Sequence, residues 1–225
     1  MGNPRILSTK ALSNEISNQL YSADLEVDTH SFIKIEKTVE KLGPECFKNP
    51  QFVITSQNTV QTLIDIGAIH NLENKQILCV GSKTERLLLS KGIFVSEIYK
   101  NSEEVSNESV RLVVGTTFFT GKRRMPVIER VFKEKRVELN VVELYDTMLT
   151  PKKMEEGYKA VLFFSPSGVE SFFKLNKLSG ARAVCIGVTT EKAVKQYTEN
   201  TIIALETTVE SVVDATLELM MSYEK

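Results

Sequence analysis

Four short polar segments each follow an apolar run of the kind that forms a β-strand, and each leads into a segment typical of a helix. The first N–H groups of a helix have no partner within it, and the helix dipole favours negative charge there. Such turns predict binding of an anionic ligand through backbone amides. They are Thr55-Ser56-Gln57-Asn58, Gly81-Ser82-Lys83-Thr84, Ser165-Pro166-Ser167-Gly168 and Gly187-Val188-Thr189-Thr190.

These turns have a second interpretation. Ser, Thr and Asn are also the commonest residues at helix N-caps, where they need no ligand. For any one turn, plain capping is the simpler interpretation, and only the fourfold repetition favours a binding site. Gly81 and Gly187 are expected to let the chain leave its strand sharply and approach a ligand closely.

Two further candidates lie outside these turns. The basic run Lys122-Arg123-Arg124 follows Gly121, and it is either a solvated helix start or a contact for a carboxylate ligand. Tyr145 lies in an extended segment, where it is either a structural aromatic residue or a side chain whose hydroxyl faces a binding cleft.

Several kinds of site find no support. His30 and His70 have no ligand-type neighbour in the sequence, so no metal site is expected. Cys79 and Cys185 lie within apolar runs, which predicts core positions. The sequence contains no dinucleotide-binding G-x-G-x-x-G, no Walker lysine loop and no G-x-S-x-G elbow, and no cofactor is expected.

Short apolar runs alternate with amphipathic segments along most of the chain. This alternation predicts an α/β protein with parallel sheets flanked by helices. Helices are expected at Ser13–Ala23, Asn58–Ile69, Thr84–Ser90 and Pro126–Lys135. Strands are expected at Arg5–Ser8, Phe52–Thr55, Gln76–Val80, Val110–Val114 or Phe118–Phe119, Val161–Phe164 and Ala183–Ile186.

An internal repeat indicates two similar units. The segment Phe52–Val60 resembles Leu162–Val169, because each has an apolar strand, a serine, two turn residues and a valine. Further along, Cys79–Glu85 resembles Cys185–Glu191. The two pairs occur in the same order, which predicts two units built from the same parts.

The extended segments Ser31–Glu36 and Val141–Thr147 bracket about one domain of sequence. We therefore expect residues 36–145 to form an inserted α/β domain. Residues 1–32 and 149–225 are expected to form a discontinuous one. Residues 33–36 and 144–148 are expected to cross as a two-stranded hinge, with a cleft between the domains.

Composition narrows the possible partners and location. The 225 residues include 28 Lys plus Arg against 29 Asp plus Glu, for a net charge of −1. Such a chain has no general attraction to nucleic acid or anionic membranes, and neither is an expected partner. Three cysteines without CxxC spacing, no secretory signal and no long apolar run favour a cytoplasmic protein.

Together these segments resemble the uroporphyrinogen-III synthase family across nearly the whole chain. No single motif is diagnostic, but their order and spacing are specific, and Phe163–Val169 is the strongest. The motifs that carry the resemblance are Ile54–Val60, Val80–Thr84, Phe119–Pro126, Leu144–Thr147, Phe163–Val169 with Phe172-Phe173, and Ile186–Thr190. The chain departs from the family pattern at Lys10, Val188 and Glu206.

The resemblance implies a lyase of haem biosynthesis that dehydrates and cyclises hydroxymethylbilane to uroporphyrinogen III, inverting the last pyrrole ring. It implies a monomer, no cofactor, and Tyr145 as a catalytic residue that protonates the departing hydroxyl. The substrate would be held by Thr55, Ser56, Gln57, Asn58, Gly81, Ser82, Lys83, Thr84, Gly121, Arg124, Ser165, Pro166, Ser167, Gly168, Gly187, Thr189 and Thr190. A non-catalytic two-domain binding or sensory protein for a small polyanion is the alternative, since folds are reused.

Overall fold

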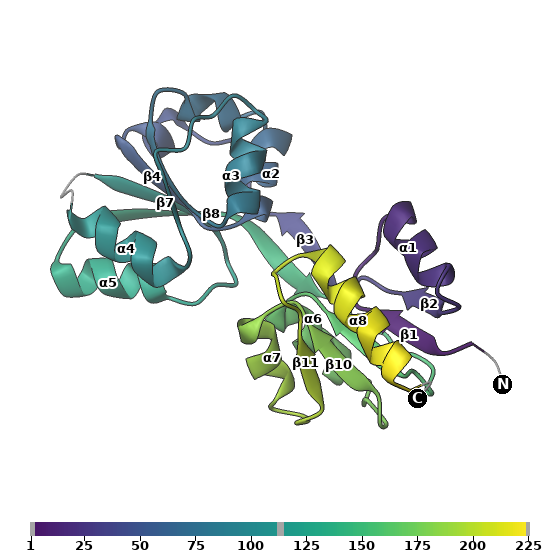
Figure 1. The fold of residues 1–225 in the computed structure, drawn as a ribbon. Coiled ribbons are helices and arrows are strands. Elements are labelled where there is room, and N and C mark those ends of the chain that lie inside the picture. Colours follow the sequence, from purple (N-terminus) through teal and green to yellow (C-terminus); the bar gives the residue numbers. More distant parts are fainter. Residues whose placement is uncertain (1–2, 112–114, 224–225) are drawn as a thin grey trace. The chain divides into compact units, whose positions relative to one another are not determined.

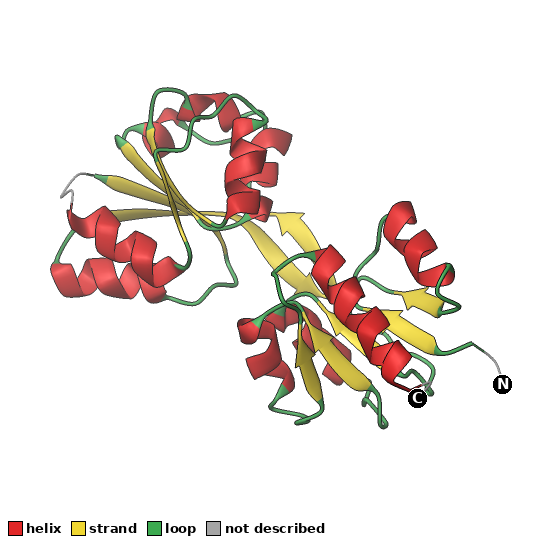
Figure 2. Ribbon diagram, in the orientation of Figure 1, coloured by secondary structure: helices red, strands yellow, loops and turns green. Residues whose placement is uncertain are grey.

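The computed structural model describes residues 3–111 and 115–223, in which the chain divides into two units (Figure 1). The discontinuous unit comprises Met1–Lys34 with Met148–Lys225, and the inserted unit comprises Ile35–Thr147. The boundaries inferred from the sequence lie within a few residues of these two divisions. Strands alternate with helices in each unit (Figure 2), so the α/β prediction is confirmed.

The discontinuous unit is built on a five-stranded parallel sheet in the order β11-β10-β9-β1-β2. In β1, Ile6 pairs with Val27 of β2 on one side and with Ala160 of β9 on the other. The strands are β1 (Arg5–Ser8), β2 (Glu26–Thr29), β9 (Ala160–Phe163), β10 (Arg182–Cys185) and β11 (Thr201–Ile203).

Alternate residues of these strands fill separate cores on the two faces of the sheet. Ile6 and Leu162 pack in one core with side chains of α1 (Asn14–Tyr21) and α8 (Val209–Tyr223). Leu7 and Phe163 pack in the other with side chains of α6 (Pro166–Phe173) and α7 (Val188–Val194). All four of these strand residues are fully buried, and burial of such a side chain stabilises the folded state by roughly 1.5–3 kcal/mol.

The inserted unit is built on a six-stranded sheet in the order β3-β8-β7-β4-β5-β6. Strands β8, β7, β4, β5 and β6 pair in parallel. The strands are β3 (Ile33–Lys37), β4 (Gln51–Ile54), β5 (Gln76–Val80), β6 (Glu97–Tyr99), β7 (Thr116–Gly121) and β8 (Leu139–Leu149).

Two cores again lie on opposite faces of this sheet. Phe52 and Ile54 pack with side chains of α2 (Gln57–Asp65) and α3 (Ser82–Leu89). Val53, between them in the strand, packs on the other face with side chains of α4 (Ser102–Arg111) and α5 (Val127–Lys135). Fully buried strands of this kind explain the continuous apolar runs in the sequence.

The internal repeat corresponds to matching elements in the two units. In the inserted unit, β4, α2, β5 and α3 follow one another, and β9, α6, β10 and α7 follow in the same way in the discontinuous unit. The first helix of each copy begins with a serine N-cap, Ser56 in one and Ser165 in the other.

The expected end of one helix was wrong, and the second of two alternatives expected for one strand is confirmed. The helix expected to reach Ile69 ends at Asp65, because Gly67 adopts a φ of +68° and a 3₁₀ turn covers Ile69–Leu72. The strand expected at Val110–Val114 or Phe118–Phe119 is β7, which contains Phe118 and Phe119. Val110 lies in α4, and residues 112–114 lie outside the described residues.

Strands β3 and β8 contain the two divisions between the units and are neighbours in the six-stranded sheet. Within the inserted unit, the Thr38 amide donates to the Leu144 carbonyl at 2.9 Å. Within the discontinuous unit, the Thr150 amide donates to the Phe32 carbonyl at 3.0 Å. That these two segments act as a hinge stays a prediction.

Candidate active site

Polar turn residues collect at the carboxyl ends of the parallel strands in both units. Ligands of open α/β sheets bind at this edge, where strand order reverses and the loops leave in opposite directions. The order reverses between β4 and β7 in the inserted unit and between β1 and β9 in the discontinuous unit. The predicted turns therefore fall at one such edge in each unit.

The turn after β4 is fixed by a serine cap. Ser56 is the N-cap of α2, and its Oγ accepts a hydrogen bond from the Asn58 amide at 3.1 Å. Thr55 is half-buried, whereas the side chains of Gln57 and Asn58 are exposed. The cap holds the first turn of α2 in place and leaves two polar side chains open to solvent.

Tyr145 lies beside this cap. Its side chain is 6% exposed, and its hydroxyl donates to the Ser56 Oγ at 3.3 Å. A Cβ atom at Gly121 would lie 2.5 Å from Cε2 and 2.6 Å from Cζ of the Tyr145 ring. Glycine at position 121 is therefore required by the close approach of this ring. The structure thus brings Ser56, Gly121 and Tyr145 together at the switch point of the inserted unit.

The turn after β5 lies on the next strand of the same edge. Gly81 adopts a φ of +82°, a conformation that favours glycine, as expected for a sharp exit from the strand. Its amide is already bonded to the Tyr99 carbonyl at 3.0 Å. Thr84 is buried, Lys83 is half-buried and Ser82 is exposed.

Arg124, which the sequence suggested as a contact for a carboxylate ligand, is engaged with carboxylates of the chain itself. Its Nε donates to Glu129 at 2.6 Å, and its Nη1 donates to Glu143 at 2.7 Å and to the Gly121 carbonyl at 3.0 Å. Burial opposes the charge of Arg124, but these two acidic partners raise its pKa above the ordinary value. Its positive charge is already matched within the unit.

In the discontinuous unit, Ser165 caps α6 and accepts a hydrogen bond from the Gly168 amide at 3.1 Å. Gly168 is buried, Ser167 is half-buried and Pro166 is exposed. A Cβ atom at Gly168 would lie 3.3 Å from the Ser165 Oγ, so the turn is tightly packed.

Sequence reasoning missed Thr9, which lies across the switch point from Ser165. Thr9 is 3% exposed, and both its amide and its hydroxyl donate to the Leu162 carbonyl, at 3.1 and 2.7 Å. These bonds join the end of β1 to the end of β9. The signal available in the sequence was a pair of hydroxyl residues, Ser8 and Thr9, directly after the first strand.

The turn after β10 differs from the expectation at one residue. Gly187 has a φ of 177°, which is extended backbone that any residue adopts, so the predicted need for glycine in a sharp turn was wrong there. A Cβ atom at this position would meet only the Thr207 side chain, at 3.2 Å. Thr189 is exposed and Thr190 is buried.

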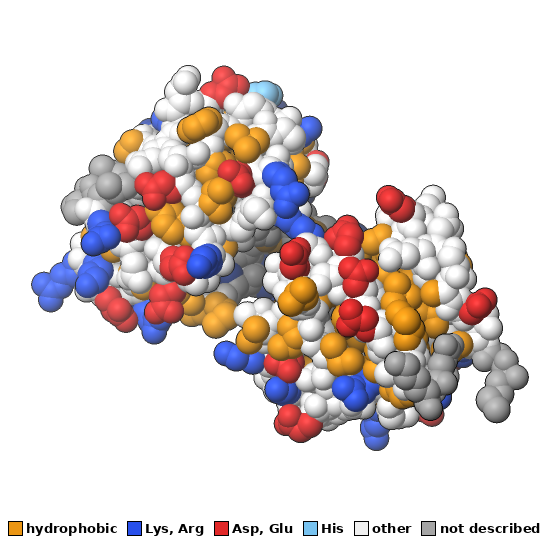
Figure 3. All heavy atoms as spheres, viewed as in Figure 1, with side chains coloured by type: hydrophobic (Ala, Val, Ile, Leu, Met, Phe, Trp, Pro, Cys, Tyr) orange, Lys and Arg blue, Asp and Glu red, His pale blue; other side chains and the backbone are white. Residues whose placement is uncertain are grey.

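The same edge of the discontinuous unit carries acidic side chains. Glu206 and Glu210 are exposed and flank the start of α8, which follows β11. Figure 3 shows acidic groups interspersed with hydrophobic side chains over the face that α8 forms. An anionic ligand at this edge would experience local repulsion from these carboxylates.

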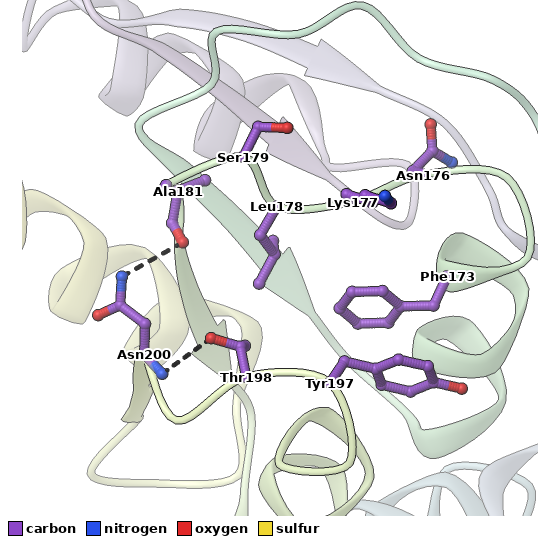
Figure 4. Close-up of a pocket in the computed structure, with 10 residues that line it drawn as sticks. Phe173, Asn176, Lys177, Leu178, Ser179, Ala181, Tyr197, Thr198 and Asn200 are labelled. Atoms are coloured by element: carbon purple, nitrogen blue, oxygen red, sulfur yellow. Dashed lines mark hydrogen bonds between the residues drawn. The ribbon is translucent and has the colours of Figure 1, made fainter.

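A pocket of about 460 Å³ lies at the opposite edge of this sheet, where β10 and β11 begin (Figure 4). Its wall includes Asn200 and the stacked rings of Phe173 and Tyr197, whose centroids are 3.9 Å apart. None of the predicted site residues lines it. We assign the candidate site to the carboxyl edge, because the reversal of strand order and the repeated polar turns coincide there.

Two further kinds of feature are absent from the described residues. Within residues 3–111 and 115–223, no three His, Cys, Asp or Glu side chains form a group suited to a metal ion. Over the same residues, no helix has the length and apolar character needed to cross a lipid bilayer.

Solved structures with a similar fold are synthases of one family. The uroporphyrinogen-III synthetase of Helicobacter pylori matches 96% of this chain and 99% of its own, with 16% identity and a TM-score of 0.72. A mutant uroporphyrinogen III synthase of Thermus thermophilus matches 98% of this chain and 99% of its own, with 14% identity and a TM-score of 0.70. At these identities the likeness concerns the fold.

Sequence comparisons extend the relationship. The porphyrin biosynthesis protein HemD of Ruminiclostridium josui is 25% identical to this chain in a match that covers 80% of it. This chain spans 40% of the length of that relative. The family model described as uroporphyrinogen-III synthase HemD matches residues 14–214, which include all the predicted site residues. The chain belongs to the uroporphyrinogen-III synthase family.

Proposed function

We propose that this protein is a uroporphyrinogen-III synthase, a cyclising hydro-lyase that converts hydroxymethylbilane to uroporphyrinogen III with inversion of the last pyrrole ring. The observation that carries the proposal is the family match over residues 14–214, which runs through both units and contains every predicted turn and Tyr145. The clustering of Ser56, Gly121 and Tyr145 at a switch point supports it.

The reaction demands control of conformation more than strong acid or base chemistry. Hydroxymethylbilane cyclises unaided to the wrong isomer, so the enzyme must hold the chain in the conformation that leads to inversion of the last ring. This is an effect of proximity and orientation. Rigid turns fixed by Ser56 and Ser165 caps are suited to that task, because capping orders the first turn of each helix before a substrate arrives.

Binding of the substrate carboxylates has to come from local donors. The chain has a net charge of −1, and Arg124 is matched by Glu129 and Glu143. We propose that backbone amides and hydroxyls at the carboxyl edge of each unit take this role. The residues proposed are those of the four turns that the sequence singled out.

Tyr145 is the proposed proton donor to the departing hydroxyl of the substrate. A phenol is a weak acid at neutral pH, so its contribution to the rate is expected to be modest. We predict that Tyr145→Phe lowers kcat by about 100-fold, the low end of the range for a general acid, and leaves the chain folded. Complete loss of turnover in a folded variant would show that the hydroxyl has a larger role than this argument allows.

Other features of the proposal follow from the family and the sequence. We propose that the enzyme works as a monomer in the cytoplasm and that its residues perform the reaction without a cofactor. Its cysteines Cys46, Cys79 and Cys185 are free thiols, which suits a reducing compartment.

The decisive test is the identity of the product isomer. The purified chain is incubated with freshly prepared hydroxymethylbilane, and the products are oxidised and separated by chromatography. A synthase forms the type III isomer, and it does so faster than hydroxymethylbilane cyclises spontaneously. If only the type I isomer forms, at the spontaneous rate, the proposal fails and a non-catalytic binding protein becomes the better interpretation.

A further inference from the structure

Strand β8 contains an irregularity directly before Tyr145. Thr120 of β7 pairs with Glu143, but the next residue of β7, Gly121, pairs with Tyr145. Leu144 is therefore an extra residue on β8, which makes this step a β-bulge. Bulges bend a strand and redirect the side chains that follow, and they are frequent beside active sites.

The bulge decides which face of the sheet Tyr145 occupies. Val142 and Leu144 pack in the core beneath α2, and Val141 packs on the opposite face, as period-two alternation requires. Continued alternation would place Tyr145 on the face opposite α2. Instead, Leu144 and Tyr145 are consecutive residues buried in the same core. The extra residue therefore brings the Tyr145 hydroxyl to Ser56 at the start of α2.

Arg124 spans the two strands at this bulge. Its Nη1 donates both to the carbonyl of Gly121 on β7 and to the carboxylate of Glu143 on β8. Its Nε is held by Glu129 on α5, and its side chain is 20% exposed. On the other side of β8, the Thr38 hydroxyl donates to the Glu143 carbonyl at 3.0 Å. The residues before the bulge are thus fixed from both sides.

We propose that Arg124 and Glu143 are positioning residues that hold the β8 bulge and thereby aim Tyr145 at the reacting edge of the inserted unit. The importance of this positioning for turnover rests on the proposed function. The Nε and Nη1 groups of Arg124 are already directed at Gly121, Glu129 and Glu143, which favours positioning over contact with the substrate.

The two possible roles of Arg124 predict opposite effects of Glu143→Ala. If Arg124 bound a substrate carboxylate, removal of Glu143 would free a cation and lower KM for a polyanionic substrate. If the pair holds the bulge, the same change releases β8, and kcat falls. Arg124→Gln and Glu143→Ala change the net charge in opposite directions, yet the positioning role predicts the same effect for both.

The kinetic test measures kcat and KM for Arg124→Gln, Glu143→Ala and the milder Glu143→Gln, each alone and combined with Tyr145→Phe. We expect each single variant to lower kcat by no more than Tyr145→Phe does, with KM changed less than twofold. When Tyr145 is already replaced by Phe, the Arg124 and Glu143 changes should cause no further loss of kcat. A raised KM for Arg124→Gln with a lowered KM for Glu143→Ala would overturn the proposal.

A second measurement is independent of catalysis. The chain has six tyrosines, so incorporation of 3-fluorotyrosine gives six fluorine resonances, and Tyr145→Phe identifies one of them by its loss. Arg124→Gln and Glu143→Ala are expected to shift or broaden this resonance and leave the other five in place, which also shows that the variants fold. Lys122→Gln removes an exposed charge from the same turn and serves as the control.

These two measurements separate the possible failures. An unmoved Tyr145 resonance in folded Arg124 and Glu143 variants overturns the positioning role, whatever the activity. If the Tyr145 resonance shifts in the Arg124 and Glu143 variants but the unmodified protein makes no type III isomer, the positioning role is supported and the proposed function is contradicted.

Discussion

Gly121→Ala is a direct probe of the contact between β7 and the Tyr145 ring. The added methyl group would meet two ring carbons at 2.5 and 2.6 Å, far inside van der Waals contact. The ring is 6% exposed and its hydroxyl is bonded to Ser56, so it cannot simply rotate into solvent. Either the ring or the end of β7 has to move.

The magnitude follows from two opposing effects. Overpacking of a buried site costs about 1–3 kcal/mol. Replacement of glycine by alanine within a strand returns roughly 0.5–1 kcal/mol, because the unfolded chain loses conformational freedom. The difference spans about 0–2.5 kcal/mol, and because a contact of 2.5 Å is severe we expect a net loss of about 1–2 kcal/mol in the free energy of unfolding of the inserted unit. We also expect a loss of turnover at least as large as that of Tyr145→Phe, since the ring is displaced.

Urea unfolding followed by circular dichroism measures the free energy, with Gly187→Ala as the matched control. Gly187 follows β10 and caps α7, but its backbone is extended and its added methyl would meet only the exposed Thr207 side chain. That variant should change stability by less than about 0.5 kcal/mol. The reasoning is refuted if Gly121→Ala is equally neutral, or if its cost persists when Tyr145 is replaced by alanine and the clash is gone.

Three further predictions concern other parts of the chain. Glu210→Gln should lower KM for a polyanionic substrate about twofold at low ionic strength and leave it unchanged in high salt. Glu218→Gln, two turns further along α8, should have less effect. Equal effects of the two variants would contradict a local repulsion of the substrate by Glu210. Burial alone would raise the pKa of Asp28, but hydrogen bonds from the Tyr158 hydroxyl and from Arg5 lower it below the ordinary value. The Asp28 carboxylate therefore stabilises the fold at pH values above its unfolded pKa, near 4. This stabilisation is lost as the pH falls towards the lower pKa of the folded state. Asp28→Asn should flatten the acid limb of a pH–stability curve, and an unchanged acid limb would contradict this. In native protein at pH 8, Ellman's reagent should modify only the half-buried Cys46, because Cys79 and Cys185 are buried and their pKa values are raised to about 11 and about 12. In denaturant, the reagent should modify all three thiols. Fast reaction of all three thiols in the native protein would contradict the burial.

The elements of the fold were predictable where the sequence pattern is strong. Strands such as Arg5–Ser8 and Gln76–Val80 are buried on both faces, so their apolar runs have no competing interpretation. The short edge strands β2, β6 and β11 carry polar or exposed residues and gave no comparable signal. Helix α4 has acidic and polar residues at most positions, and only a few buried contacts reveal its inner face.

The candidate site was predictable in its place but not in its connections. A serine directly after a buried strand indicates both a cap and the carboxyl edge, which is how Ser56 and Ser165 were found. The contacts of Arg124 were not predictable, because Glu143 is distant in sequence and the pairing depends on the register of β8 against β7. Thr9 was missed because its role appears only once β1 is known to lie beside β9.

The bulge in β8 explains why the alternation of residues in the sequence does not predict the position of Tyr145. Alternation along β8 assigns Tyr145 to one face of the sheet, and a single unpaired residue, Leu144, reverses the assignment. The reversal has a cost, since the regular ladder is interrupted, and the chain offsets it with bonds from Arg124 and Thr38 to the residues around the bulge. Glycine at position 121 then leaves room for the ring. Thr38, Gly121 and Arg124 thus all support the placement of one side chain, whose hydroxyl lies at the predicted site.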